Sequence, residues 1–242
     1  FLVTITLMGI ATAGVGLVPS AATIGWWAPA IVLLLRVAQG MALGGEYGGA
    51  AIYVAEHAPA GKAGFYTSFI QAGVAGGFIL SLGVVLATKA ALPAEAWVGG
   101  GWRFPFLFSV VLLGVSLWMR LKLSESPVFA AMRAAGERAK NPLKECFTYP
   151  GNLRRMIVAL FGIAAGLAVV WYTAMFSVLS FLQVQMRVEE TTAQVLVGVA
   201  MFFGAGWYVL FGRLSDRWGR KRPIMLGYVL TLVLLFPIFW TI

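Results

Sequence analysis

Long stretches without a charged residue dominate this sequence and predict helices that cross a membrane. Charge-free runs cover residues 1–35, 63–88 and 156–186, and two shorter runs cover residues 191–212 and 223–242. A helix spans the hydrocarbon core of a bilayer with about 20 apolar residues. The pattern therefore predicts seven spans, at residues 1–18, 29–55, 65–86, 104–119, 156–182, 192–211 and 224–242.

The composition excludes an ordinary soluble domain. Hydrophobic residues make up 60% of the 242 positions and charged residues 11%, whereas about a quarter of a typical soluble domain is charged. Phe1 and Ile242 both lie inside apolar runs and no signal-peptide pattern opens the chain, so we expect a fragment of a longer protein. Cys146 is the only cysteine, which excludes a disulfide within the chain and fits a reducing cytoplasmic loop.

The net charge of +9 is distributed unevenly between the two sides of the predicted membrane protein. Because successive spans alternate in direction, each loop can be assigned to a side, and one side has only Lys89, Arg103 and Arg187. The other side faces the cytoplasm by the positive-inside rule, so the charge indicates a multi-pass protein of the plasma membrane, the inner membrane in bacteria, and no nucleic-acid partner. The basic side carries Lys62, Arg120, Lys122, Arg133, Arg138, Lys140, Lys144, Arg154, Arg155, Arg213, Arg217, Arg220, Lys221 and Arg222.

One long polar stretch divides the chain. Residues 121–155 separate four predicted spans in residues 1–120 from three in residues 156–242. We interpret the stretch as a cytoplasmic connection between an N-terminal and a C-terminal helical bundle. Within it, residues 128–140 are rich in Ala and Arg and predict an amphipathic surface helix. These patterns together predict an all-α membrane protein.

The second span carries a regular series of glycines. Gly40, Gly44 and Gly48 recur every four residues, as do Gly45 and Gly49. Ridges of small residues with this spacing allow helix backbones to approach closely in lipid. We therefore expect these glycines to serve helix packing.

Polar and charged side chains follow the same span. At 100° per residue, Gln39 and Glu46 share one stripe, and Arg36 lies one turn from Gln39. A charge at membrane depth costs about 2.5–3.5 kcal/mol on insertion scales, so it is normally paired or faces water. Two interpretations stay open: a path for substrate or protons, for which Arg36 is the better candidate because Glu46 lies nearer the inner end, or a static ion pair with a neighbouring helix. The candidate path residues in the first bundle are Arg36, Gln39, Glu46, Tyr47 and Gln71.

Residues 212–223 form a second segment rich in charge. We expect them to fill the short inner loop between the sixth and seventh spans. A turn that places Asp216 among Arg217 and Arg220 favours charge-assisted bonds to helix ends, which can form in one conformation and break in another. The same basic residues also serve as a positive-inside anchor.

This segment resembles the signature loop of the major facilitator superfamily, in which Gly, Asp, Arg and then Gly-Arg-Lys follow one another as they do here. The signature occurs once in each half of family members, and its position after the polar connection matches the second-half copy. The resemblance implies a major-facilitator-type helical bundle, in which this chain supplies about seven transmembrane helices, from the third to the ninth of an expected twelve.

Further segments together resemble the metabolite:proton symporter family of that superfamily, which is known for dicarboxylates, citrate, shikimate, and proline or betaine. They are Gln39-Gly40 and residues 44–49, 102–106 and 125–129. The resemblance implies proton-coupled symport of a small organic anion or zwitterion by alternating access, in which two bundles rock about a midplane site. The expected partners are this substrate, protons and the lipid bilayer, the protein is expected to be a monomer, and no cofactor is expected.

The resemblance also implies substrate contacts in the second bundle. Trp171, Tyr172 and Thr173 lie in the span that corresponds to a cavity-lining helix of the superfamily, which makes them candidates. Aromatic residues in membrane helices also serve packing or lipid contact, so that interpretation stays open.

A cytoplasmic gate is the third implication. In relatives, the loop after the second span has a Glu, a Pro and then a basic residue directly before a Gly. Here Glu56 and Pro59 are present but Ala63 precedes Gly64, and Lys62 is the adjacent substitute. The expected gate residues are Glu56, Lys62, Glu125, Gly212, Asp216, Arg217, Gly219 and Arg220.

Several other functions are weighed against symport. The sequence has no metal-ligand cluster, nucleotide-binding glycine loop or nucleophile arrangement, so neither an enzyme nor an ATP-driven pump is expected. A sugar porter or drug exporter of the same fold, and a transport-inactive membrane sensor, stay open. Glu46 is the only acidic residue well inside a span, and the proton carrier is either Glu46 or an acidic residue outside this chain.

Overall fold

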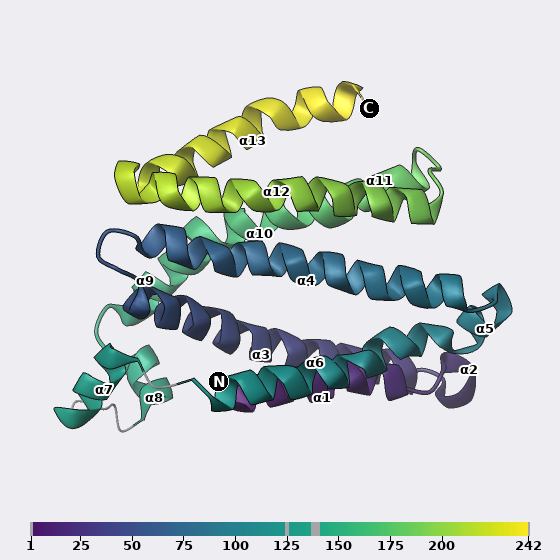
Figure 1. Cartoon of the computed structure of the whole chain (residues 1–242), viewed down its shortest axis with the longest axis horizontal. Helices are drawn as coiled ribbons and strands as arrows, with labels where there is room; N and C mark the ends of the chain where they lie inside the picture. The colour runs from purple at the N-terminus through teal and green to yellow at the C-terminus, as the bar shows by residue number, and fades with distance from the viewer. Residues whose placement is uncertain (1, 124–125, 137–140, 242) are drawn as a thin grey trace.

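The computed structural model describes residues 2–123, 126–136 and 141–241, which fold into helices without strands (Figure 1). Six helical stretches are long and apolar enough to cross a membrane: Trp27–His57, Ala63–Ala91, Gly101–Leu121, Asn152–Val184, Glu190–Trp218 and Lys221–Ile238. A seventh apolar helix, Leu2–Leu17, is shorter, at 16 residues. The prediction of an all-α membrane protein with about seven spans is confirmed.

Long helices alternate with short connecting ones. The long helices are α1 (Leu2–Leu17), α3 (Trp27–His57), α4 (Ala63–Ala91), α6 (Phe104–Leu121), α12 (Glu190–Trp218) and α13 (Lys221–Thr241). The short ones are α2 (Ala21–Ile24), α5 (Ala94–Gly99), η1 (Gly101–Arg103), α7 (Pro127–Ala134) and α8 (Pro142–Thr148). The fifth span is built from α9 (Asn152–Ala159), η2 (Leu160–Ala164), α10 (Ala165–Tyr172), η3 (Thr173–Ser177) and α11 (Val178–Val184).

The long helices lie side by side with roughly parallel axes (Figure 1). Helix α1 packs between α3 and α6, and α4 lies against α3. Helix α12 packs along α4 more extensively than any other pair of described helices. We refer to α1–α6 as the first bundle and to α9–α13 as the second, so the α4–α12 pair is the main contact between the bundles. The division of the chain at residues 121–155 stays a prediction.

The prediction of a loop at residues 212–223 is wrong, because the segment is mostly helical. Helix α12 continues to Trp218, Gly219 ends it with φ 83°, and α13 begins at Lys221. A helix of 29 residues is about 43 Å long, which exceeds the roughly 30 Å hydrocarbon core. The charged end of α12 therefore extends beyond the apolar part of the span, where its side chains reach water.

The fifth span also departs from a regular helix. Two π-helical turns, Leu160–Ala164 and Thr173–Ser177, interrupt it on either side of α10. A π turn widens the helix and often marks a functional site. Hydropathy could not predict these turns, because they leave the apolar pattern almost unchanged.

The connection between the bundles contains two short capped helices. At α7, the Ser126 hydroxyl accepts a hydrogen bond from the Phe129 N–H at 3.2 Å. At α8, the Asn141 side chain accepts one from the Lys144 N–H at 3.1 Å. Helix α7 covers the first part of the surface helix predicted at 128–140, and residues 137–140 lie outside the described part of the chain.

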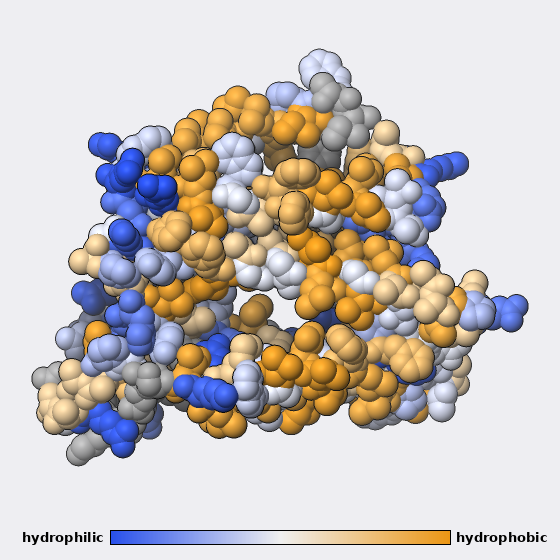
Figure 2. Space-filling view, in the orientation of Figure 1, coloured by the Kyte–Doolittle hydropathy of each residue, from blue (hydrophilic) through white to orange (hydrophobic). Residues whose placement is uncertain are grey.

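Apolar side chains cover the flanks of the helices, and charged ones gather at the two ends (Figure 2). Trp240 and Phe236, for example, are 91% and 77% exposed. The buried positions are mainly small, including Ala42, Ala75 and Ala193. Large apolar side chains on the outside and small ones between helices are typical of packing in lipid.

Candidate functional site

A hydrogen-bonded chain joins the predicted path residues of α3 to α1. Arg36 Nη1 donates to Gln39 Oε1 at 3.2 Å, and Gln39 Nε2 donates to Thr12 Oγ1 at 2.9 Å. Arg36 is exposed and Gln39 is half-buried. The amide of Gln39 is thereby fixed between two partners, and it holds a guanidinium at an exposed position within the length of a membrane span.

Glu46 forms an ion pair within the first bundle. Arg120 Nη2 of α6 lies 3.2 Å from Glu46 Oε1, and the two side chains are 19% and 27% exposed. A cavity of about 180 Å³ between α1, α3 and α6 is lined by Glu46 and also by Thr12, Ser109 and Ser116. The cavity therefore adjoins both Glu46 and the hydrogen-bonded chain that ends at Thr12. This ion pair with a neighbouring helix is the arrangement that the second interpretation of Glu46 describes.

Tyr47 and Gln71 join α3 to α4. The Tyr47 hydroxyl donates to Gln71 Oε1 at 3.3 Å. Along α3, Tyr47 lies about 12 Å from Gln39 by the 1.5 Å rise per residue. The candidate path residues of the first bundle therefore form separate polar contacts along α3 and do not form one cluster.

Aromatic residues of the fifth span form a cluster that reaches the first bundle. Trp171, Tyr172 and Phe176 lie with ring centroids 5.2–6.0 Å apart, and Phe176 meets Phe78 of α4 at 6.4 Å. The Trp171 Nε1 atom is buried and has no hydrogen-bond partner among the described residues. Thr173 begins the π-helical turn η3. Phe78 and Phe176 could not be singled out from the sequence, because nothing in a uniformly apolar span distinguishes an aromatic residue that faces a neighbouring helix.

The glycines of α3 occupy different environments. A Cβ atom placed on Gly45 would lie 2.9 Å from Thr4 Cγ2, so Gly45 allows α1 to approach α3. At Gly40, Gly44 and Gly48 no described atom lies within 4 Å of such a Cβ. Gly49 lines a second cavity. A packing role for Gly40, Gly44 and Gly48 stays a prediction.

A contact between the bundles forms at the basic end of α4 and α12. Asp216 Oδ1 accepts a hydrogen bond from the Gly64 N–H at 2.7 Å, and Oδ2 accepts one from the Phe65 N–H at 2.8 Å. Arg220 Nη2 lies 3.0 Å from Asp216 Oδ1, and another guanidinium nitrogen of Arg220 donates to the Ser215 hydroxyl. We call Asp216, Gly64, Phe65 and Arg220 the inner latch. Its carboxylate satisfies two orphan N–H groups in the first turn of α4, where the helix dipole favours a negative charge.

Two glycines make this contact possible. A Cβ on Gly212 would lie 2.7 Å from the Gly64 carbonyl oxygen and would also collide with Ser68. A Cβ on Gly64 would collide with Ser215 and Arg220. The backbones of α4 and α12 therefore approach too closely here for any other residue type.

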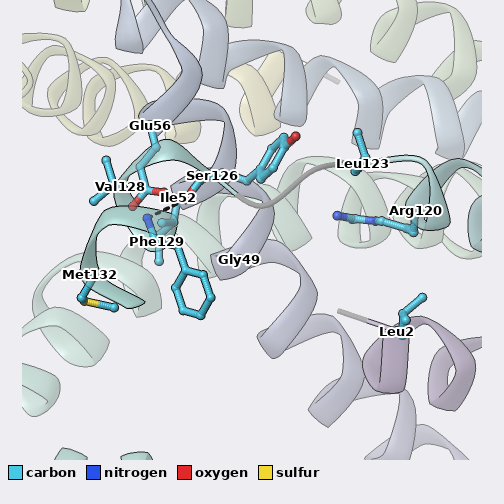
Figure 3. Close-up of a pocket in the computed structure, with 11 residues that line it drawn as sticks. Leu2, Gly49, Ile52, Glu56, Arg120, Leu123, Ser126, Val128, Phe129 and Met132 are labelled. Carbon is cyan, nitrogen blue, oxygen red and sulfur yellow. Dashed lines mark hydrogen bonds between the residues drawn. The ribbon is translucent and has the colours of Figure 1, made fainter. Parts of the chain in front are cut away.

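The predicted gate residues lie in two places. Glu56, at the end of α3, lines a cavity of about 460 Å³ together with Arg120 and the apolar face of α7 (Figure 3). In this view, Glu56 lies over the start of α7 and Arg120 lies on the opposite side of the cavity. The Lys62 and Arg217 side chains form no hydrogen bond or ion pair with any other described residue. Glu125 lies outside the described residues.

Comparisons with known proteins cover the whole chain. The profile of the Major Facilitator Superfamily matches residues 1–242. The shikimate transporter of Escherichia coli K12 is 34% identical over 250 residues, which are 98% of this chain and 54% of that protein. The proline/betaine transporter of Salmonella typhimurium LT2 is 34% identical over 247 residues, with 98% and 49% covered. The inner membrane metabolite transport protein YhjE of Escherichia coli K12 is 34% identical over 243 residues, with 96% and 52% covered.

These matches locate the chain within longer proteins. It spans about half the length of the curated relatives that it matches. All three are named as transport proteins and none as an enzyme, in agreement with the prediction against an enzyme. No solved structure matches the chain significantly.

Proposed function

Because this chain belongs to the major facilitator superfamily, we propose that it is part of a secondary transporter that couples the movement of a small organic anion or zwitterion to protons. The two bundles rock about a site near the midplane and expose it to each side of the membrane in turn. The transporter is a monomer in the plasma membrane, the inner membrane of a bacterium, with its basic end in the cytoplasm. Relatives named for shikimate and for proline/betaine support this class of substrate.

The inner latch is the observation that carries the proposal. It joins the two bundles through a carboxylate, two backbone N–H groups and a guanidinium at the basic end of the molecule. Alternating access requires contacts between the bundles that close one side and then release it. Charge-assisted hydrogen bonds suit this role, because water and other charges can replace their partners at the membrane surface.

Arg36 is the proposed contact for an anionic group of the substrate. Its guanidinium is held by Gln39 and carries further N–H donors that bond no other described residue. A planar guanidinium binds a carboxylate through two parallel hydrogen bonds. In the second bundle, Trp171, Tyr172 and Thr173 are the proposed contacts, and the buried Trp171 N–H is available to an acceptor of the substrate.

Glu46 is the proposed proton carrier within this chain. Protonation would remove its charge and weaken its bond to Arg120. The adjoining cavity, with the hydroxyl groups of Thr12, Ser109 and Ser116, provides polar partners along which water could deliver the proton. The same protonation would change the field at the gate residue Glu56, which shares a cavity with Arg120.

Uptake by the full-length protein in lipid vesicles tests the proposal. We expect an inward proton gradient to drive accumulation of labelled shikimate, proline or betaine, and a protonophore to abolish it. Accumulation that does not depend on the proton gradient would reject symport. Accumulation of a sugar alone, or export of a drug, would instead support the other transporters of the same fold, and a protein that moves none of these compounds would favour the sensor.

A substitution tests the role of Arg36 in the same vesicles. Arg36→Gln keeps a hydrogen-bonding side chain but removes the charge, so we expect the KM for an anionic substrate to rise about 10-fold or more, since losing a charged hydrogen bond costs about 1.5–3 kcal/mol. Arg187→Gln is the control, because Arg187 lies in the loop between α11 and α12, and this variant should leave KM unchanged. An unchanged KM in Arg36→Gln would exclude the proposed contact.

A further inference from the structure

A second ion pair joins α4 and α12 at the end opposite the inner latch. Lys89 Nζ lies 2.9 Å from Glu190 Oε2, and the side chains are 34% and 59% exposed. Lys89 is in the last turn of α4, and Glu190 is in the first turn of α12. Gln194 Nε2 donates to the other carboxylate oxygen of Glu190 at 3.1 Å and holds the carboxylate in position.

The two contacts lie on opposite faces of the membrane. Phe65 and Lys89, both on α4, are about 36 Å apart by the rise of an α-helix. This distance exceeds the roughly 30 Å thickness of the hydrocarbon core. Because the inner latch lies at the basic end, the Lys89–Glu190 pair lies at the outer surface.

Between these contacts, the α4–α12 interface is made of small and apolar side chains. Ala75 on α4 and Ala193 on α12 are fully buried, and a Cβ on Gly198 would lie 2.9 Å from Leu82 Cδ2. In the part of the chain that the structure describes, no ion pair joins the two helices between their ends. The charged contacts of this interface are therefore confined to its two ends.

We propose that Lys89 and Glu190 form an outer latch, which must open when the transporter exposes its site to the outside. This inference rests on the proposed alternating access and adds the outer counterpart of the inner latch. Both contacts are formed in the structure, which therefore corresponds to a state closed at both ends of the α4–α12 pair. Exposure to the cytoplasm opens the inner latch and keeps the outer one closed, and exposure to the outside does the reverse.

The positions of the two charges make the outer latch easy to open. Glu190 at the start of α12 and Lys89 at the end of α4 each lie where the helix dipole favours their sign. Each charge therefore stays favourably placed after the pair separates. Their exposure lets water replace the lost partner and lets salt screen the attraction.

The neighbouring Glu189 provides a matched control. Its carboxylate accepts a hydrogen bond from the Thr192 hydroxyl at 2.8 Å and so bonds its own helix end and not α4. Hydrogen bonds from Thr191 and Thr192 hold the pKa of Glu189 below its usual value, which keeps this carboxylate charged. Replacing Glu189 changes the local charge as much as replacing Glu190 does, without touching the proposed latch.

Labelling of a cysteine between α4 and α12 tests the outer latch. The full-length protein carries Cys146→Ser and Leu82→Cys, and a membrane-impermeant maleimide is added from outside. We expect Lys89→Glu and Glu190→Lys each to raise the labelling rate several-fold, because like charges then push the outer ends apart. The exchanged pair, Lys89→Glu with Glu190→Lys, should return the rate to its original value, and Glu189→Lys should leave it unchanged.

Two results would overturn the outer latch: single reversals that label at the original rate, and an exchanged pair that labels as fast as the single reversals. If a reversal prevents folding, the milder Lys89→Gln and Glu190→Gln replace it, with the same direction expected. Labelling is independent of uptake, so the two proposals can fail separately. Normal uptake with insensitive labelling rejects the latch alone, whereas the expected labelling in a protein without uptake rejects symport alone.

Discussion

The Glu46–Arg120 pair and the inner latch are both charged contacts between helices, but they differ in what they join. Glu46 and Arg120 connect α3 to α6 within one bundle, and both side chains are largely shielded from solvent. The inner latch connects α4 to α12 across the two bundles, and its Arg220 side chain is 55% exposed while Asp216 is 9% exposed. A contact inside one bundle moves with it as a unit, whereas a contact across the proposed moving bundles must break when the end at which it lies opens.

Charged contacts therefore serve two purposes in this chain, within a bundle and between bundles. Half-buried charge within a bundle is costly to leave unpaired, so it is suited to a lasting contact or to a change of protonation. Charge at the membrane surface is cheaper to separate, because water replaces the partner. Substitutions that act on only one kind of contact can therefore distinguish an effect on the stability of a bundle from an effect on the movement between bundles.

The largest effect is expected from Gly212→Ala. The added methyl group would collide with Ser68 and the Gly64 carbonyl, and overpacking of this kind costs about 1–3 kcal/mol. The variant should unfold at a lower temperature in detergent and lose uptake. Gly204→Ala on the same helix is the control, because no described atom lies within 4 Å of its added Cβ. Equal stability of the two variants would contradict the close approach at Gly212.

Asp216→Asn should have a more local effect, confined mainly to the inner latch. The amide keeps one acceptor oxygen for the α4 N–H groups but loses the charge that attracts Arg220. A charged hydrogen bond contributes about 1.5–3 kcal/mol, so we expect cysteine labelling from the cytoplasmic side to rise about 10-fold. Arg217→Gln, which removes a nearby charge outside the latch, should leave labelling unchanged, and an equal rise in both variants would reject the latch.

Glu46→Gln should affect the first bundle and leave the latches intact. The neutral side chain cannot be protonated further and pairs less strongly with Arg120. Uptake should lose its dependence on the proton gradient, and the free energy of unfolding should fall by about 1–3 kcal/mol. Labelling at both ends should stay as in the unmodified protein. Glu95→Gln is the control, because Glu95 lies in the short connecting helix α5. A normal gradient dependence in Glu46→Gln would assign the proton to another residue.

Salt should have the smallest effect and should distinguish the two latches. Between 0.15 M and 1 M salt, the Debye length falls from about 8 Å to about 3 Å. The side chains of the outer latch are 34% and 59% exposed, whereas the Asp216 side chain is only 9% exposed and also bonds two backbone N–H groups. Labelling from outside should therefore rise with salt more than labelling from the cytoplasmic side. An equal rise on both sides would contradict the predicted difference in salt sensitivity between the two latches.

Hydropathy predicted the long apolar helices well, because these depend on local composition. The charged segment at 212–223 was assigned to a loop, since Arg213, Asp216 and Arg217 end the apolar run without ending the helix. A hydropathy pattern detects where the chain leaves the hydrocarbon core. The helix itself continues beyond that point and ends only at Gly219, which has a positive φ.

The contacts between distant segments could not be predicted in the same way. The sequence indicated that Asp216 would bond a helix end, but not that the partners are Gly64 and Phe65. Lys89 and Glu190 lie in ordinary loop-adjacent positions, and only the pairing of α4 with α12 makes them neighbours. The polar contacts of Gln39 with Thr12 and of Glu46 with Arg120 likewise depend on which helices become neighbours.

The close approach of the α4 and α12 backbones at Gly64 and Gly212 has a mechanical consequence. In a rocking motion that pivots about this contact, the segment of α12 that moves, from Gly212 to Glu190, is about 33 Å long by the rise of an α-helix. A tilt of α12 by about 5° about this contact would move Glu190 by about 3 Å. That displacement is enough to carry Glu190 from 2.9 Å to beyond ion-pair reach of Lys89.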